Sequence, residues 1–385
     1  MRSKLVSLLL VALLLLASFS TALAQDGVYC GDLSADDCAI LQSAQEAMMS
    51  VMSYKSDATY AAAVSGLPGV SDAAVTVNVA GAFDWSEDAL MVAGMLAGQT
   101  QEEVMAALGE NPQALVDLVN GLSTDVVFSY EMNQELADEL GAQLGAALPA
   151  SASVPVIISG GNLYWDASAF AAWGAYEGWV GMPLGEVLSQ LAAAGAFDPA
   201  MMEQMASDPT TAAAMVVPAM LLAPDAFSEF VTLARDADVD VDGQTAAVFT
   251  TSLDIAGLLS SPMFSDLVSQ LVASGAIEGV SSADVEQLLP MLPMVAPMLG
   301  LTIEGAQTIG LEDFMVYNTT SEIVWDLAGL GQLAAMSGAD LGLGAEAGLS
   351  FVVSVDDSDF GADQGIAAPE GAAMLTAEQV LSGGQ

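Results

Sequence analysis

Three aspartates alternate along one short segment and have the residue type of a calcium-binding loop. Asp238, Asp240 and Asp242 precede Gly243, which matches the early positions of an EF-hand loop. The twelfth position is Phe249, where such a loop needs a bidentate glutamate. The flanking residues alternate as in strands, and Asp-Gly is typical of a tight hairpin turn. We therefore predict a β-hairpin here, and the three carboxylates are kept only as weak cation candidates.

A second acidic group lies near the C-terminus. Asp356, Asp357, Asp359 and Asp363 have the same residue type but no ligand spacing that defines a metal loop. We interpret them as a solvated polar loop, and we predict no metal site.

The chain contains no histidine, which removes most catalytic machinery. Neither a Ser-His-Asp nor a Cys-His arrangement can be built. There is also no Gly-x-Ser-x-Gly elbow and no phosphate-binding Gly-Lys-Ser/Thr loop. A carboxylate pair could still hydrolyse sugars, but 49 Asp and Glu give no reason to choose one pair. We expect no enzyme activity and no cofactor.

Methionines gather in two apolar segments, over residues 199–223 and 288–301. Methionine adapts to irregular apolar partners, so such segments suit the lining of a lipid site. Ordinary core packing is the plainer interpretation, and composition alone favours it. The candidate lining residues are Met202, Met205, Met215, Val216, Met220, Leu222, Met291, Met294 and Met298.

Residues 1–24 have the pattern of a secretory signal peptide. Arg2 and Lys4 give a positive start, an apolar stretch follows over residues 5–19, and Ala22-Leu23-Ala24 is a small-x-small cleavage site. A membrane anchor is the alternative, but the apolar stretch is shorter than the roughly 20 residues of a span and no stop-transfer charges follow. We expect an exported protein, in the extracellular space or in the periplasm or cell envelope.

The mature chain is strongly acidic and also apolar. Two of the four basic residues lie in the signal peptide, so the mature net charge is 2 minus 49, or −47. Such a charge repels nucleic acid and anionic membrane surfaces. Because 54% of the residues are apolar and the mean hydropathy is +0.55, we expect a large core and not disorder. The later apolar runs are short and contain proline, so we expect no transmembrane anchor.

The two cysteines, Cys30 and Cys38, are close in sequence. A disulfide is the usual state of such a pair in an exported protein. Lipidation of Cys30 and a metal site are the alternatives. Val28 and Tyr29 do not suit lipidation, and two thiolates without histidine are few for a metal. We expect a Cys30–Cys38 disulfide.

The periodicity of the chain predicts hairpins of strands with helices inserted between them. This pattern is typical of an α+β fold with an antiparallel sheet. We predict a single domain over residues 43–385, after an N-terminal segment over 25–42 that carries the disulfide loop. The predicted helices cover residues 39–53, 112–122, 134–148 and 183–194, and the segments 199–223 and 282–299 are also predicted helical. The predicted strands cover residues 59–64, 73–83, 125–132, 154–158, 163–165, 230–241, 244–253, 308–317, 321–327 and 349–355.

Several segments together resemble the LolA-like superfamily, in particular its LppX/LprG-type lipoprotein branch. The resemblance covers most of the mature chain, through short and degenerate motifs. It lies in Gly161-Asn162-Leu163-Tyr164-Trp165, in Gly178-Trp179, in Val239-Asp240-Val241-Asp242-Gly243-Gln244-Thr245, in residues 349–355, and in the tail Asp359-Phe360 with Ile366-Ala367-Ala368-Pro369. It implies a curved antiparallel half-barrel with helices packed on its concave face around an apolar cavity that holds lipids.

Two functions are therefore expected in order. The first is a secreted or periplasmic non-enzymatic carrier of lipid or another apolar ligand, in which the Met-rich segments line the cavity. The second is a structural or interaction module of the cell envelope with a filled core and acidic, cation-binding loops. The residues indicate no particular protein partner.

Overall fold

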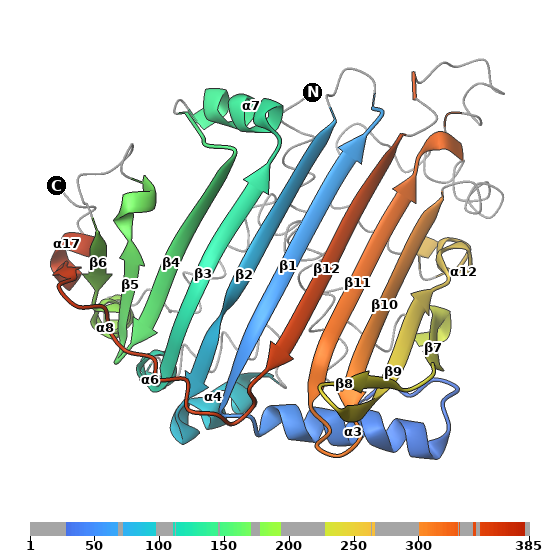
Figure 1. Cartoon of the computed structure of the whole chain (residues 1–385), viewed down its shortest axis with the longest axis horizontal. Coiled ribbons are helices and arrows are strands. Elements are labelled where there is room, and N and C mark those ends of the chain that lie inside the picture. Colours follow the sequence, from blue (N-terminus) through green and yellow to red (C-terminus); the bar gives the residue numbers. More distant parts are fainter. Residues whose placement is uncertain are drawn as a thin grey trace.

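The sheet of this protein consists of two meanders that meet where the first long strand pairs with the last. The computed structural model describes residues 28–67, 72–97, 111, 113–144, 147–170, 178–193, 228–262, 264–265, 300–329, 331, 342–343 and 347–381. Within these residues the strand order is β13-β6-β5-β4-β3-β2-β1-β12-β11-β10-β9-β7, and β8 pairs with β9 outside this path. Figure 1 shows this order across the face of the sheet.

The strands of the first meander are β1 (Ser53–Ser65), β2 (Ala73–Trp85), β3 (Leu122–Met132), β4 (Ser151–Ser159), β5 (Asn162–Asp166) and β6 (Trp179–Met182). The strands of the second are β7 (Val231–Arg235), β8 (Val239–Val241), β9 (Gln244–Leu253), β10 (Leu301–Gly310), β11 (Val316–Asp326) and β12 (Gly348–Ser358). The short β13 (Ala373–Met374) pairs with β6 in parallel, and every other pair is antiparallel. The predicted α+β fold with an antiparallel sheet is confirmed.

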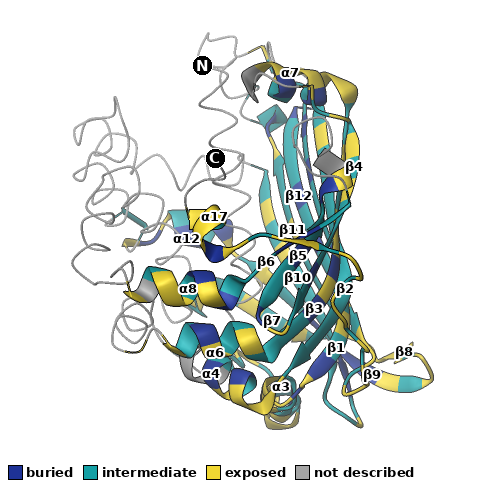
Figure 2. Cartoon of the chain, turned by 90° about the vertical axis from the view of Figure 1, so that its left-hand side faces the viewer, coloured by how far each residue is buried: buried dark blue, intermediate teal, exposed yellow. Residues whose placement is uncertain are grey.

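The helices gather on one side of the sheet. Figure 2 shows α4, α6, α8 and α12 on the same side, and the edges of the sheet bend toward them, so this side is the concave face. The predicted helices on the concave face of a curved sheet are thus confirmed. Their bounds are α3 (Ala35–Met49), α4 (Glu87–Ala97), α6 (Gln113–Gly121), α7 (Gln134–Leu144), α8 (Leu184–Ala193), α12 (Ile255–Leu259) and α17 (Ala377–Leu381).

The predicted hairpin at Asp242 and Gly243 is confirmed. Val241 pairs with Gln244 across a two-residue turn, and both turn residues have positive φ, 53° at Asp242 and 87° at Gly243. Asp-Gly suits this turn because these residues tolerate the left-handed conformation best. The first predicted strand is interrupted, since residues 236–238 separate β7 from β8.

One predicted strand is wrong. Residues 308–317 were expected to form one strand, but β10 ends at Gly310 and β11 begins at Val316. The turn between them is stabilised by Asp313, whose Oδ1 accepts a hydrogen bond from the Met315 amide, and Phe314 has a φ of 59°. No glycine or proline marks this turn within residues 311–315, so its signal is absent from the sequence.

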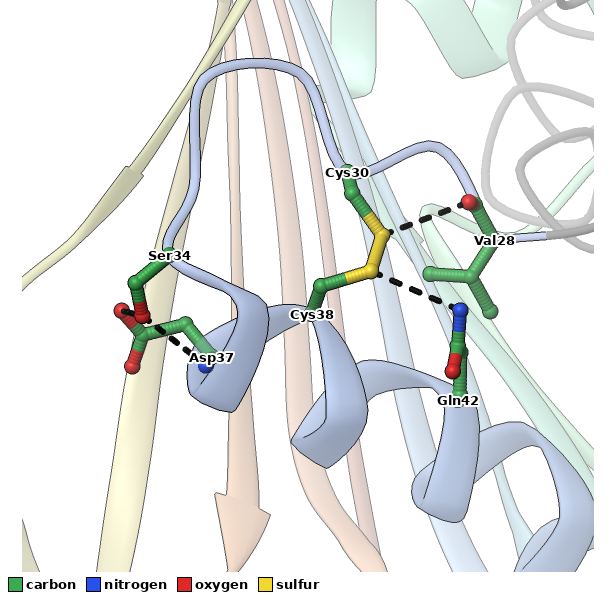
Figure 3. The surroundings of a disulfide bond; sticks show 6 residues. All are labelled: Val28, Cys30, Ser34, Asp37, Cys38 and Gln42. Atoms are coloured by element: carbon green, nitrogen blue, oxygen red, sulfur yellow. Dashed lines mark hydrogen bonds between the residues drawn. A yellow bond between two sulfur atoms is a disulfide. The ribbon is translucent and has the colours of Figure 1, made fainter.

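The disulfide between Cys30 and Cys38 is confirmed, with Cα atoms 5.3 Å apart. It joins the segment before α3 to the first turn of that helix, as Figure 3 shows. Ser34 caps the helix, because its Oγ accepts a hydrogen bond from the Asp37 amide at 3.1 Å. The start of α3 is therefore fixed four residues earlier than the predicted residue 39.

Candidate ligand-binding face

The concave face of the sheet is apolar over most of its length. The register places side chains of alternate residues on this face. Its members in the four central strands and in β11 are Tyr54, Ser56, Ala58, Tyr60, Ala62 and Val64 of β1, Val75, Val77, Val79, Gly81 and Phe83 of β2, Thr124, Val126, Phe128 and Tyr130 of β3, Leu349, Phe351, Val353, Val355 and Asp357 of β12, and Thr319, Ser321, Ile323 and Trp325 of β11. Branched and aromatic residues therefore dominate the side on which the helices lie.

The opposite, convex face is polar and rich in hydroxyl groups. One row across it runs through Ser153, Ser129, Asn78, Thr59, Ser354 and Thr320, which are direct neighbours in adjacent strands. Two like-charged pairs also lie there, Asp57 opposite Asp356 and Glu304 opposite Glu322. This division of polarity indicates that the convex face is solvated and that the concave face is the interior.

Part of the concave face is packed as a core. Ala62, Phe351 and Val353 are buried in contact with one another, with Tyr60, Val75, Ile323 and Val355 around them. At the β9 and β10 end, Leu41 and Ala44 of α3 pack on Phe249 and Ile309. Thus α3 covers the second meander, and the centre of the sheet has its own apolar cluster.

Another part of the same face is not covered. Phe128, in the middle of β3, is 44% exposed. It lies between Val79 and Val154 in the register, both of which are only half-buried. A large aromatic side chain of a core-facing position is normally buried far more completely. The described residues thus leave apolar surface open on the concave face around Phe128.

Two buried polar atoms on this face have no hydrogen-bond partner within the described part of the chain, Trp325 Nε1 and Asp357 Oδ1. They lie at opposite ends of the face. Trp325 is opposite Leu349, and Leu349 is eight residues before Asp357 along β12, which corresponds to about 27 Å. Apolar positions on β1 and β12 fill the distance between them.

Asp357 has an environment that the sequence did not indicate. It lies inside β12, opposite Ser56, so the expected solvated loop is wrong at this position. Burial raises the pKa of Asp357, the hydrogen bond with Ser56 lowers it, and the charge of Asp356 raises it again. Burial and then the charge of Asp357 also raise the pKa of Tyr54.

This environment predicts that stability rises as the pH falls. Because the folded pKa of Asp357 is raised, the folded state binds its proton more tightly than the unfolded state, whose pKa is near 3.8. Stability is lost as the pH rises through the interval between these two values, and the loss persists above it. Asp357→Asn should therefore melt at a higher temperature than the parent near pH 7, with a difference that shrinks toward pH 3.

The matched control for this prediction is Asp356→Asn. Asp356 is the neighbouring residue, it removes the same charge, and it lies exposed on the convex face. Thermal melts of the parent and both variants from pH 3 to pH 7 isolate the buried group. Equal pH dependence of the two variants would contradict the prediction.

The sequence-predicted site residues fall into three groups. The candidate lining residues Met202, Met205, Met215, Val216, Met220, Leu222, Met291, Met294 and Met298 lie outside the described residues. The cation candidates are engaged within their hairpin, since Asp238 pairs with Arg235 and Asp240 accepts from the Gly243 amide at 3.1 Å. No group of three or more His, Cys, Asp or Glu among the described residues could hold a metal ion.

Sequence reasoning did not single out Phe128, Trp325 or Asp357. The alternation of Val126, Phe128 and Tyr130 against Val127 and its neighbours is visible in the sequence, but both sets are apolar enough to face inward. Only the pairing of strands shows which set lies under the helices.

Across the ranges that the structure describes, no helix is both long enough and apolar enough to span a membrane.

Comparison with known proteins gives a likeness of fold alone. No protein-family model matches this chain, and no curated protein matches it either. Among solved structures, the Mycobacterium tuberculosis lipoprotein LppX matches with 11% identity and a TM-score of 0.27, covering 86% of this chain and 97% of its own. LprF from Mycobacterium bovis matches with 12% identity and a TM-score of 0.30, covering 88% of this chain and 99% of its own. The predicted resemblance to LppX-type proteins is confirmed to this extent, and at these TM-scores no functional conclusion is drawn from it.

Proposed function

We propose that this protein is a non-enzymatic binding or carrier protein for a lipid or another apolar ligand. The observation that supports it most directly is the half-open apolar surface around Phe128, on the face of the sheet that the helices cover. Apolar surface left open in a concave interior is the usual property of a ligand site. The sequence motifs that resemble the LolA-like superfamily support the same class of ligand.

The proposed role is binding without chemistry. The chain has no histidine to act as base or metal ligand, and the polar atoms of the concave face are scattered among apolar side chains. The Met-rich segments 199–223 and 288–301 are proposed to complete the lining.

We further propose that the protein acts after export, in the extracellular space or the cell envelope. The signal-peptide pattern of residues 1–24 supports this location. The Cys30–Cys38 disulfide supports it independently, because such bonds persist in oxidising compartments.

The Phe128→Asp variant should bind apolar probes at least tenfold more weakly than the parent. A carboxylate placed on the open apolar surface would have to be desolvated by any bound apolar chain. The measurement is a titration of the mature protein with a fluorescent fatty-acid analogue whose emission rises in apolar surroundings.

Val127→Asp is the matched control for this variant. Val127 is the next residue, is 38% exposed, and lies on the convex face. It should change the affinity by less than twofold. Equal losses in both variants would assign probe binding to a non-specific effect of charge, and no binding by the parent would remove the proposed function.

The second candidate is an interaction module of the cell envelope. The like-charged pairs Asp57 with Asp356 and Glu304 with Glu322 favour it, because opposed like charges cost stability unless cations or a partner compensate them. A parent protein that binds no apolar probe, but that melts at a clearly higher temperature with millimolar divalent cations, would favour this function.

A further inference from the structure

The concave face contains one carboxyl group whose bonding is incomplete. Asp357 Oδ1 is buried and has no partner among the described residues. The other interactions of this side chain are with Ser56, directly opposite in β1, and with the charge of Asp356. A buried polar atom without a partner costs about 1–3 kcal/mol, and more when the group is charged. An acceptor left in this state therefore indicates a missing hydrogen-bond donor.

The chain itself has no cation left to supply that donor. Outside the predicted signal peptide the basic residues are Lys55 and Arg235. Lys55 lies on the convex side of β1 and pairs with Asp359 at 2.6 Å. Arg235 pairs with Asp37 at 3.5 Å and with Asp238 at the far edge of the sheet.

The surroundings of Asp357 combine a polar end with an apolar body. Tyr54 and Phe83 are stacked beside it at the same end of the sheet, with ring centroids 5.1 Å apart. In the other direction along β12 the same face continues with Val355, Val353 and Phe351. A molecule that lies along this face would place its chain on the valines and one end at the carboxyl group.

We propose that Asp357 and Ser56 bind the hydrogen-bond-donating head group of an apolar ligand, a hydroxyl or an amine, while its chain lies along β12 and β1. This inference rests on the proposed function and specifies its ligand class. Asp357 Oδ1 accepts the hydrogen bond of the head group, and the Ser56 hydroxyl holds the carboxyl group in place. A ligand that ends in a carboxylate or an ether meets repulsion or an unpaired acceptor at this point.

The test uses three decyl compounds that differ only in their head groups: 1-decanol, its methyl ether and decylamine. Their affinities for the mature protein are measured by displacement of the fluorescent fatty-acid analogue at 0.5 M salt, which screens the acidic surface. The parent should bind decanol and decylamine about tenfold more tightly than the ether, because the ether cannot donate a hydrogen bond. Asp357→Val should abolish this discrimination and leave the affinity for the ether unchanged within twofold.

Asp356→Asn and Asp357→Asn separate the site from the general negative charge. Both remove one charge at adjacent positions, but only Asp357 lies on the concave face. Asp357→Asn should weaken decylamine about tenfold, and Asp356→Asn less than twofold. Equal affinity of the parent for alcohol and ether, retained discrimination in Asp357→Val, or equal effects of the two Asn variants would each overturn the assignment of the head-group site. Binding of none of the decyl compounds and no displacement of the analogue would instead overturn the proposed function itself.

Discussion

Replacement of Arg235 by methionine should lower the free energy of unfolding by about 2–3 kcal/mol, as expected for the loss of several hydrogen bonds to a charged group. The guanidinium donates to the carbonyl oxygens of Asp236 at 2.6 Å and of Val248 at 3.4 Å. It also lies 5.2 Å from the centroid of the Phe249 ring, which adds a cation–π attraction. Arg235 thus connects the edge strand β7 to β9 through four kinds of contact.

The same side chain connects the sheet to the N-terminal helix. Its Nε is 3.5 Å from Asp37 in the first turn of α3, and its exposed fraction is only 18%. An ion pair that is largely shielded from water contributes more than an exposed pair, and removal of one partner leaves the other carboxylate uncompensated. We therefore expect the loss to include weaker docking of α3 on Phe249 and Ile309.

Lys55→Met is the control, because Lys55 is the other basic residue of the mature chain. Its pair with Asp359 is short, at 2.6 Å, but both side chains are more than half exposed. Exposed pairs contribute about 0–1 kcal/mol. Urea unfolding followed by tryptophan fluorescence should separate the two variants clearly, and similar losses in both would show that Arg235 acts only as a surface charge.

The strands were predictable wherever alternation was long and the turns had marked residues. Residues 73–83 alternate strictly and form β2, and Asp242-Gly243 marks a turn that the structure contains. The turn at residues 311–315 depends on the Asp313 side chain and a left-handed Phe314, and neither has a distinctive local signal. The first half of β10 was missed for a related reason, because Leu301 follows an apolar run that was interpreted as helix.

The candidate site was less predictable than the fold. Val127 and Phe128 are adjacent, apolar and similarly exposed, yet only Phe128 faces the helices. Asp356 and Asp357 are identical residues in sequence, and the register of β12 with β1 alone places one in solvent and one in the interior. A sequence specifies such differences only through the pairing of distant strands, in this case across about 300 residues, which local periodicity does not report.

Replacement of both cysteines by serine should cost about 2.5 kcal/mol of stability. The disulfide closes a loop with a sequence separation of eight residues, and the chain-entropy relation gives this value for a loop of that size. Serine keeps the size and polarity of the side chain, so the change reports the covalent link. Dithiothreitol should lower the melting temperature of the parent to that of the double variant and leave the variant itself unchanged.

The two large effects should not be independent, because they hold the same helix. Asp37, the partner of Arg235, is adjacent to Cys38 and lies inside the disulfide loop. Tyr29, next to Cys30, donates a bifurcated hydrogen bond to the carbonyl oxygens of Ser228 at 2.7 Å and of Val231 at 3.0 Å, beside the same edge strand. Once the disulfide is absent, the first turn of α3 is held less firmly, and Arg235→Met then removes less.

A double-mutant cycle measures this dependence. The combined variant should lose at least 0.5 kcal/mol less than the sum of the separate losses, which is the range found for residues in one network. Losses that add fully would mean that the disulfide loop and the Arg235 contacts stabilise separate parts of the molecule. Coupling would instead show that the N-terminal segment and the edge of the second meander form one unit, which fixes α3 over that end of the concave face.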